Sequence, residues 1–405
     1  MKIKDIGHVV TGKTPSTEID EYYGGNIMFI SPSDLHGDYL IEESEKTITE
    51  EGLNSIETNS IGGLSVLTGC IGWDMGNVAM CNSRCATNQQ INTITRFNES
   101  IADPRYVYYW LKGKKDYLFS IASVTRTPIL SKSVFEDIDI PIPCLGVQKK
   151  VANLLSNIDE KIRINSKIND YLEEMAKTIY DYWFAQYDFP DENGKPYKSS
   201  GGKMQNISDF GIAPCDWKTG NLYDIANFIN GLACQKYRPN ENESSLPVIK
   251  IREMHEGISV DSERVKADLP QNNIVNTGDI LFSWSASLEV QRWAGTTGGL
   301  NQHIFKVIPN DGYTSSYVYH QLKAYVVKFI QMAEARKTTM GHITSDHLKQ
   351  SVIVLPPENV IQKFSNSVDM IHAEVSRINM ENQKLCQIRN WLLPMLMNGQ
   401  ATIED

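Results

Sequence analysis

Two long segments of the sequence carry apolar residues at every seventh position, the first from Val151 and the second from Phe364. A seven-residue period that continues over about five heptads is typical of helices that pair in a coiled coil. Lys161 and Asn165 favour this pairing, because a polar seam residue fixes the register at some cost in stability. The alternative is a long amphipathic helix packed on its own domain. The predicted seam residues are Val151, Leu154, Ile158, Asn165, Ile168, Leu172, Met175, Ile179, Phe364, Ile371, Ile378, Leu385, Ile388 and Leu392.

A series of short strand patterns with one clear helical pattern precedes each heptad segment, in the same order both times and at an offset of about 213 residues. The best-matched strings are Asn88-Gln89 with Asn301-Gln302 and YVYYWLK with YVYHQLK. In the first copy the helical pattern covers PRYVYYWLKGKKDYLFSIA. The pattern therefore predicts a mixed α/β domain that is present twice.

The stretch YDFPDENGKPYKSSGGKM separates the two copies and is rich in Gly, Pro, Ser and Lys. This composition predicts an exposed linker. The expected organisation is a first domain at 1–146, a long helix at 147–186, the linker at 187–215, a second domain at 216–357 and a second long helix at 358–400.

The composition is that of an ordinary globular protein, with 41% hydrophobic and 22% charged residues among 405. No apolar run approaches the roughly 20 residues that span a bilayer, and the N-terminus lacks the features of a signal peptide, so we expect a cytoplasmic protein without membrane contact. The seven cysteines form no C-x-x-C pair, which predicts free thiols and no metal site. A net charge of -10 confines any contact with nucleic acid to local basic patches or to a partner.

The string GHVVTGKT, Gly7 to Thr14, matches the phosphate-binding P-loop pattern. A working P-loop also needs a helix that begins at its lysine and an acidic residue on another strand for magnesium. Here Pro15 follows directly, and the second copy has NFINGLACQKYRP at this place. We therefore expect no nucleotide site, and no other catalytic motif stands out. A stand-alone P-loop enzyme remains the alternative.

One segment is basic in both copies, where the helical pattern runs into a threonine-rich loop, TRTPILS or KTTMGHIT. Cations, short hydroxyl side chains and backbone N–H groups together suit phosphate oxygens, whereas a solvated helix face is the alternative interpretation. The candidate DNA contacts in these segments are Lys112, Lys114, Lys115, Arg126, Thr127, Lys132, Lys323, Arg336, Lys337, Thr338 and Thr339. Further candidates on predicted loops are Lys13, Thr14, Arg84, Lys236, Arg238, Arg252 and Arg292.

The tandem α/β repeat with its two heptad helices resembles the specificity (S) subunit of type I restriction-modification enzymes over essentially the whole chain. The strings that carry the resemblance are GDILFSWSAS, GGLNQHIFKV, SRCATNQQI and YDYWFAQYDFPDENGKPYKSSGGKM. The last of them is similar to the central conserved region of that family.

The resemblance implies an α/β protein with two target recognition domains in pseudo-twofold arrangement, separated by two helices that form an antiparallel coiled coil. Each domain would read one half of a bipartite, asymmetric site in double-stranded DNA, and the helices would dock two modification (M) subunits. S-adenosylmethionine would bind to the M subunits, and ATP and magnesium to restriction (R) subunits, so this chain would be non-catalytic and hold no cofactor. The remaining alternative is a coiled-coil scaffold without base readout.

Overall fold

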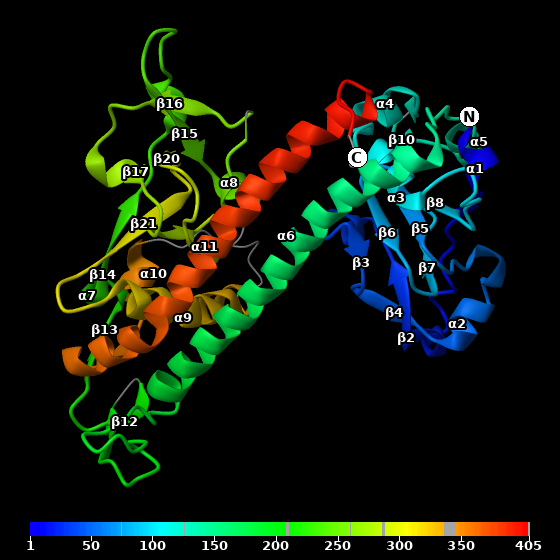
Figure 1. Cartoon of the computed structure of the whole chain (residues 1–405). Coiled ribbons are helices and arrows are strands. Elements are labelled where there is room, and N and C mark those ends of the chain that lie inside the picture. The colour runs from blue at the N-terminus through cyan, green and yellow to red at the C-terminus, as the bar shows by residue number, and fades with distance from the viewer. Residues whose placement is uncertain are drawn as a thin grey trace. The chain divides into compact units, whose positions relative to one another are not determined.

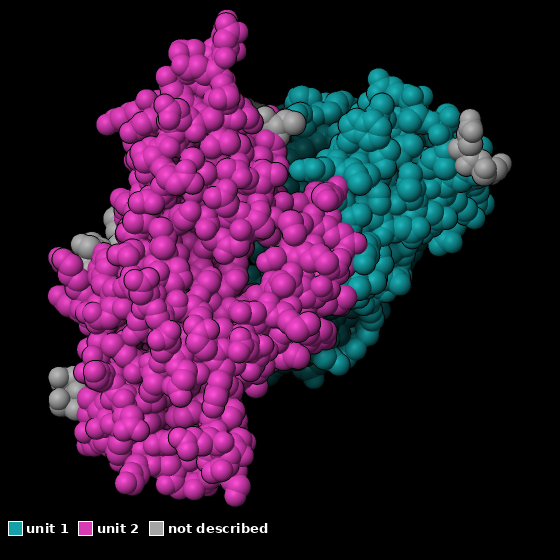
Figure 2. All heavy atoms as spheres, turned by 60° about the vertical axis from the view of Figure 1, so that its left-hand side comes forward, with its two compact units in different colours: residues 1–164, 385–405 teal, residues 165–384 magenta. Residues whose placement is uncertain are grey.

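The computed structural model describes residues 1–73, 75–124, 126–207, 210–259, 261–285, 288–335 and 345–403. The chain forms two compact units, which Figure 2 colours separately. Unit 1 comprises Met1–Ile164 and Leu385–Asp405, and unit 2 comprises Asn165–Lys384. Both boundaries between the units fall inside the two long helices, so each unit contains one part of each helix.

Unit 1 contains a five-stranded sheet in the order β1-β8-β5-β6-β3 and a three-stranded sheet in the order β4-β2-β7 (Figure 1). The strands are β1 (His8–Thr11), β2 (Tyr23–Ile30), β3 (Leu40–Ile41), β4 (Lys46–Ile48), β5 (Ser65–Gly69), β6 (Val78–Cys81), β7 (Cys85–Thr87), β8 (Ile91–Thr95) and the small pair β9 (Ser123–Val124) and β10 (Pro128–Ile129). The helices outside the coiled coil are α1 (Ile3–Ile6), η1 (Asp20–Tyr22), η2 (Pro32–His36), α2 (Glu50–Asn54), η3 (Glu57–Asn59), α3 (Pro104–Lys112), α4 (Lys115–Ser120) and α5 (Lys132–Glu136).

The central strands β5 and β8 are buried along their whole length, and their polar side chains, among them Ser65, Thr68 and Asn92, are buried with them. Helix α3 packs its aromatic face into the same core, and Asp103 caps it by accepting a hydrogen bond from the Arg105 backbone N–H. The sequence predicted one helix through this region. The structure corrects that prediction, because α3 ends at Gly113, a poor helix former, and α4 begins two residues later.

Unit 2 contains a four-stranded sheet in the order β14-β21-β18-β19 and another in the order β16-β15-β20-β17. The strands are β11 (Met204–Ile207), β12 (Gly211–Pro214), β13 (Lys218–Gly220), β14 (Ala226–Asn230), β15 (Ser245–Ile249), β16 (Arg264–Lys266), β17 (Ile274–Val275), β18 (Ile280–Ser283), β19 (Glu289–Arg292), β20 (Gly298–Leu300), β21 (Ile304–Pro309) and β22 (Ile353–Leu355). The helices outside the coiled coil are α7 (Leu222–Ile225), η5 (Cys234–Tyr237), α8 (Ile251–Glu256), η6 (Gln271–Asn273), α9 (Ser315–Ala335) and α10 (Ser345–Lys349).

The tandem repeat of the sequence is also a repeat of topology. In unit 1, β8 pairs antiparallel with β1 and β5, and β5 with β6. In unit 2, β21 pairs in the same way with β14 and β18, and β18 with β19. The parallel pair of β2 with β7 is matched by β15 with β20. Both units therefore present the same strand ends in the same order.

The two long helices are α6 (Leu145–Tyr180), which a π-helical turn η4 (Asp181–Ala185) continues, and α11 (Glu358–Met397). Within unit 1, Asp159 of α6 contacts Arg389 of α11. Within unit 2, Asn165 and Asn169 donate side-chain hydrogen bonds to Asn382 at 2.8 Å and Asn379 at 2.7 Å. Partner numbers fall along α11 as they rise along α6, so the helices pair antiparallel.

Four residues of the predicted seam do not lie in it. Leu154, Ile168, Met175 and Ile388 are 36%, 41%, 49% and 48% exposed. Near the middle of the coiled coil the seam consists of polar side chains that hydrogen-bond to one another across it. A search for apolar periodicity therefore found the correct period but assigned these four residues to the wrong face.

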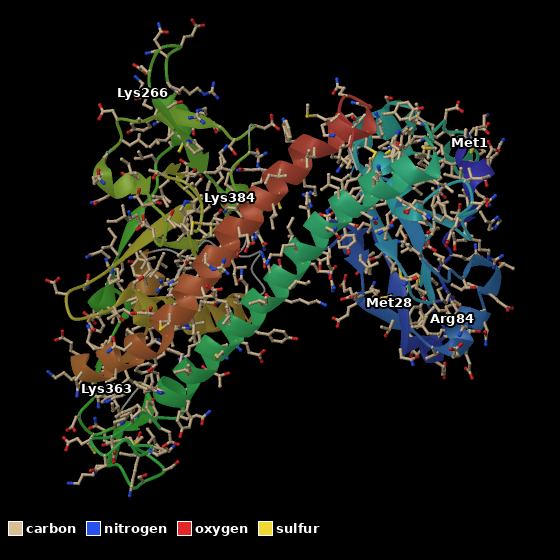
Figure 3. The ribbon with its side chains drawn as sticks, viewed as in Figure 1. Met1, Met28, Arg84, Lys266, Lys363 and Lys384 are labelled. Carbon is tan, nitrogen blue, oxygen red and sulfur yellow. The ribbon has the colours of Figure 1, made fainter. Side chains whose placement is uncertain are left out.

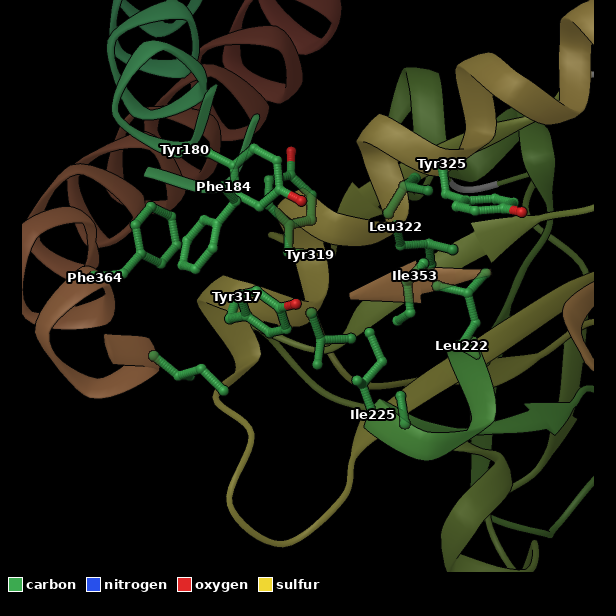
Figure 4. Close-up of a cluster of buried hydrophobic side chains, with 14 of the residues drawn as sticks. Tyr180, Phe184, Leu222, Ile225, Tyr317, Tyr319, Leu322, Tyr325, Ile353 and Phe364 are labelled. Carbon is green, nitrogen blue, oxygen red and sulfur yellow. The ribbon is translucent and has the colours of Figure 1, made fainter. Parts of the chain in front are cut away.

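The predicted linker contributes to the core of unit 2 and is not exposed throughout. Phe189 is 6% exposed, and its ring stacks on Tyr197 and Trp217 at centroid distances of 4.7 and 5.3 Å. Next to this cluster, the ring centroid of Phe184 lies 5.0 Å from that of Tyr317 and 5.1 Å from that of Phe364 (Figure 4). The aromatic residues that flank the Gly- and Ser-rich stretch anchor the segment, which composition alone did not reveal.

Candidate nucleic-acid interface

Three loops of unit 1 meet at one end of the five-stranded sheet. Thr11, the last residue of β1, pairs with Asn92 near the start of β8, and Gly69, the last residue of β5, pairs with Ile91. Thr68 pairs with Val78, the first residue of β6. The loops 12–15, 70–77 and 88–90 therefore lie side by side, and we call them the loop end of unit 1.

The loop end holds Lys13 and Thr14 in a fixed backbone. The Lys13 N–H donates to the Thr87 carbonyl at 2.9 Å, and the Thr14 hydroxyl donates to Gln89 at 2.7 Å. A Cβ on Gly12 would lie 2.0 Å from the Asn88 carbonyl oxygen, so only glycine permits this close approach. Lys13 itself is exposed and can reach a phosphate group.

The basic, threonine-rich loop of unit 1 adjoins the same end of the sheet. Its strand β10 is held there by a hydrogen bond from the Gly72 N–H to the Pro128 carbonyl at 3.0 Å. Arg126 and Thr127, directly before this strand, are exposed. Lys115 of α4 packs against Gly76 of the 70–77 loop and donates to Asn77 at 2.9 Å. The structure thus gathers candidates from distant parts of the sequence at one surface.

Sequence reasoning missed two side chains of the loop end, Trp73 and Gln89. Trp73 is 72% exposed, and Gln89 is exposed in the turn before β8. A polar amide and an indole can both contact DNA bases, the first at their edges and the second at their faces. Gln89 belongs to the matched Asn-Gln strings, which was the signal that could have found it.

Other candidates of unit 1 lie elsewhere or are already paired. Arg84 follows β6 at the end opposite to the loop end, near Met28, and donates to both carboxylate oxygens of Glu50 at 2.8 and 2.9 Å (Figure 3). Lys132 lies 3.6 Å from Glu136 in an ion pair. Lys114 of α4's N-terminal turn is half-buried over the ring of Trp110. These three residues are not gathered with Lys13 and Arg126.

Lys112 and Lys323, the matched lysines of the two basic segments, stabilise the fold in the same way. Each ammonium lies 5.1 Å from the ring centroid of the tyrosine four residues earlier and donates to its hydroxyl. Lys323 also contacts Glu173 of α6 at 3.1 Å, and burial lowers the pKa of Lys112. The recurrence of these two cations therefore has a cause within the fold, the packing of each lysine on its tyrosine.

Unit 2 has a corresponding loop end, formed where β14 and β18 finish and β21 begins. A Cβ on Gly231 would lie 2.0 Å from the Asn301 carbonyl oxygen, which repeats the contact of Gly12 with Asn88. Gln302, His303 and Trp284 lie here, and the rings of the last two are 5.9 Å apart. Lys236 is exposed on the loop that follows β14.

Three further arginines of unit 2 have partners within the fold. Arg238 lies 3.9 Å from Glu263, and Arg252 lies 2.7 Å from Glu253. Arg292 is largely buried over the ring of Tyr319, donates to Ser316 at 3.0 Å, and has its pKa lowered by burial, so it is not a surface contact. The candidates Arg336, Lys337, Thr338 and Thr339 lie outside the described residues.

A buried histidine pair connects α9 with α11 in unit 2. The Nε2 atoms of His320 and His372 are 2.9 Å apart, and His372 Nδ1 lies 2.9 Å from the Ser316 hydroxyl, which donates to Asp369. His372 then donates from Nδ1, and one of the two Nε2 atoms donates to the other, so the two rings cannot both be charged. Burial lowers the pKa of His320 to about 2 and that of His372 to about 3.

The P-loop match does not have P-loop geometry. His8–Thr11 forms strand β1, and the loop that contains Lys13 does not lead into an α-helix. Among the described residues, no group of three His, Cys, Asp or Glu side chains could hold a metal ion. Within the same ranges, no helix combines the length and apolar character needed to cross a bilayer.

Comparison with known proteins gives one consistent result. The family model for the type I restriction modification DNA specificity domain matches residues 1–174 and 214–388. The chain is 26% identical over 419 residues to the type I restriction enzyme MjaIX specificity subunit of Methanocaldococcus jannaschii, covering 100% of this chain and 93% of the relative. It is 21% identical to the HindI specificity subunit of Haemophilus influenzae, covering 75% and 78% of the two chains. The fold resembles the S subunit of a type I system from M. genitalium, with a TM-score of 0.57, 14% identity, and coverage of 98% of this chain and 95% of that one.

Proposed function

Because the chain belongs to the family of type I restriction modification DNA specificity domains, we propose that it selects the DNA sequence for a type I restriction-modification complex and catalyses no reaction itself. Each recognition domain reads one half of a bipartite site in double-stranded DNA. The methyl donor, ATP and magnesium bind to partner subunits, which carry the chemistry.

The matched loop ends are the observation that carries this proposal. Both units present the same strand ends. In each, a glycine lies directly against the backbone carbonyl of an asparagine, Gly12 against Asn88 and Gly231 against Asn301. The exposed side chains on these ends differ between the units, with Lys13 and Gln89 on one and Lys236 and His303 on the other. A repeated frame with different exposed residues suits a target whose two halves have different sequences.

Local placement of positive charge explains how a chain with a net charge of -10 can bind DNA. At the loop end of unit 1, the exposed cations Lys13, Lys115 and Arg126 come from three segments of the sequence. Phosphate contacts of this kind fix the register of the protein on the duplex, and base contacts add the specificity. Partner subunits supply the remaining contacts.

The exposed apolar side chains of α6 are the proposed docking surface for methyltransferase subunits. In unit 2, Ile168, Tyr171 and Met175 are 41%, 71% and 49% exposed at helical spacing. Asn169, which faces α11, has a different helical phase, so these three side chains point away from the coiled-coil seam. In unit 1, Leu154 lies on the same helix, 36% exposed. The face in unit 2 fits a methyltransferase subunit, since exposed apolar patches mark protein contacts.

Mapping of methylated adenines tests the proposed function. The chain is co-expressed with the methyltransferase subunits of its host, and the methylated positions in the DNA are sequenced. We expect one bipartite motif with two unlike halves, and no methylation by the chain alone. Replacing residues 216–357 with the matching segment of a relative changes one half of the motif and preserves the other. A loss of both half-site preferences would contradict independent reading by the two domains.

A further inference from the structure

We propose that Trp73 stacks on a base of the half-site that unit 1 reads, and that Trp284, in the corresponding loop of unit 2, contacts a base of the other half-site. This inference rests on the proposed function, and it adds a contact with base faces to the contacts with phosphates and base edges. It starts from the large exposure of Trp73 and from the occurrence of a tryptophan in the equivalent loop of both domains.

The 70–77 loop presents Trp73 to solvent, while Gly72, Met75 and Gly76 beside it are anchored. Met75, two residues further on, is 1% exposed in the core of unit 1. The Gly76 N–H donates to the Gly69 carbonyl at 2.8 Å, and the Met75 N–H to the Gly72 carbonyl at 3.2 Å. Gly72 and Gly76 have φ values of +99° and +87°, which a residue with a side chain rarely adopts. The loop is therefore shaped before any ligand binds.

The indole of Trp73 has little contact with its own domain. Its ring centroid lies 5.9 Å from that of Phe119 on α4, with 36° between the planes, and 72% of the residue remains exposed. An indole that packed for stability alone would lie against the core, as Trp110 does at 4% exposure. A rigid, flat and exposed aromatic ring is suited to stacking.

The corresponding loop of unit 2 also carries a tryptophan, although strand register matches Trp284 to Cys70 and not to Trp73. Trp73 follows β5 in the loop to β6, and Trp284 directly follows β18 in the segment leading to β19, its topological equivalent. The two halves share few residues outside the core, and the chain has seven tryptophans in all. Trp284 also lies at the loop end but is partly buried, with its ring centroid 5.9 Å from that of His303 and 5.8 Å from that of Phe305 in the core.

The surroundings of Trp73 favour DNA as the occupant. Lys115 and Arg126 lie on segments that contact the 70–77 loop through Gly76 and Gly72, and both are exposed. Cations beside an aromatic ring match the two parts of a nucleotide, its phosphate and its base. The occupant is therefore a base of the duplex, partly unstacked or reached from a groove, and not an apolar protein surface.

Photochemical cross-linking of the assembled complex tests the inference. Thymines of the target are replaced one at a time by 5-iodouracil, and the cross-linked peptides are identified by mass spectrometry. We expect cross-links to Trp73 from one half-site and to Trp284 from the other. Cross-links that reach neither tryptophan from any position, in a complex that still binds and methylates its target, would overturn the inference and leave the proposed function intact. A complex that selects no DNA sequence would overturn both.

Substitutions provide the second measurement. Trp73→Ala should weaken binding to the target by roughly 5- to 150-fold, the range for loss of one stacked base, with an unchanged salt dependence because no phosphate contact is lost. Trp73→Phe should recover part of the affinity. Tyr117→Ala, an exposed aromatic on α4 outside the loop end, is the matched control and should bind as the unaltered complex does. Weaker assembly of the Trp73→Ala complex with undiminished affinity for DNA would instead assign Trp73 to a protein contact and overturn the inference.

Discussion

Arg389 of α11 donates a hydrogen bond to Asp159 of α6 at 2.6 Å, in a part of unit 1 where Asp159 is only 3% exposed. The Tyr109 hydroxyl donates to the other carboxylate oxygen at 2.6 Å. Arg389→Ala leaves a buried carboxylate with one of its partners removed. We expect a loss of roughly 3–5 kcal/mol in the free energy of unfolding of unit 1, measured by urea denaturation.

A double substitution distinguishes two contributions to the free energy of unfolding: the stabilisation from the ion pair itself, and the destabilisation from leaving one buried charge unpaired. Asp159→Leu with Arg389→Leu removes both charges together and should recover most of the stability that Arg389→Ala loses, because no buried charge remains unpaired. A double variant as unstable as the single one would show that the pair itself, and not the unpaired carboxylate, determines the loss.

The asparagine pairs of the seam fix the register of the two helices. They also make the coiled coil less stable than apolar pairs would. Asn169→Leu with Asn379→Leu should raise the melting temperature of the chain, since an apolar pair packs better than two amides. The same variant should also show higher-order association in sedimentation, because an apolar seam accepts other partners and other registers. Increased stability without any change in association would contradict the register role.

The exposed face of α6 can be tested without disturbing the fold. Tyr171→Glu and Met175→Glu place charges on side chains that are 71% and 49% exposed, so the melting temperature should change little. Binding of methyltransferase subunits, measured by co-purification, should be lost. Asp170→Lys changes a charge at an exposed position off this face and is the control that should keep the complex intact.

Arg126 and Lys112 were both candidate phosphate contacts, and the structure predicts opposite results for them. Arg126→Ala should weaken binding to all DNA sequences alike and lower the salt slope by about one unit, with no loss of stability. Lys112→Ala should lower the melting temperature, because Lys112 donates to the Tyr108 hydroxyl at 2.7 Å, and leave the salt slope unchanged. Binding isotherms at several salt concentrations and a thermal scan distinguish the two outcomes.

The buried histidines make unit 2 sensitive to acid. Both rings stay neutral in the fold at pH values where the unfolded chain, with an ordinary histidine pKa of about 6.5, takes up protons. Stability is therefore complete above pH 6.5 and falls below it, by about 1.4 kcal/mol per pH unit for each ring. His320→Gln should remove about half of this slope in urea denaturation between pH 7 and pH 5, whereas His303→Gln, at an exposed site, should not.

The sequence by itself determined the tandem repeat, the order of its strands, and the presence of two long helices with a heptad period. These features are local, since the period of an element and the order of elements are written in neighbouring residues. The heptad period also located α6 along the chain. It did not reveal that the helix continues as a π-helical turn, which only the structure showed.

The tertiary structure decided which face of each helix is covered and which charges are available. Leu154, Ile168 and Met175 have the apolar character of seam residues, yet the partner helix lies against Asp159 and Asn169, which hydrogen-bond to it across the seam. Lys112 and Arg126 look alike in the sequence, and only the packing of Lys112 on Tyr108 separates them. Whether a group is buried, paired or exposed depends on atoms contributed by distant segments, so the chain has to fold before that is settled.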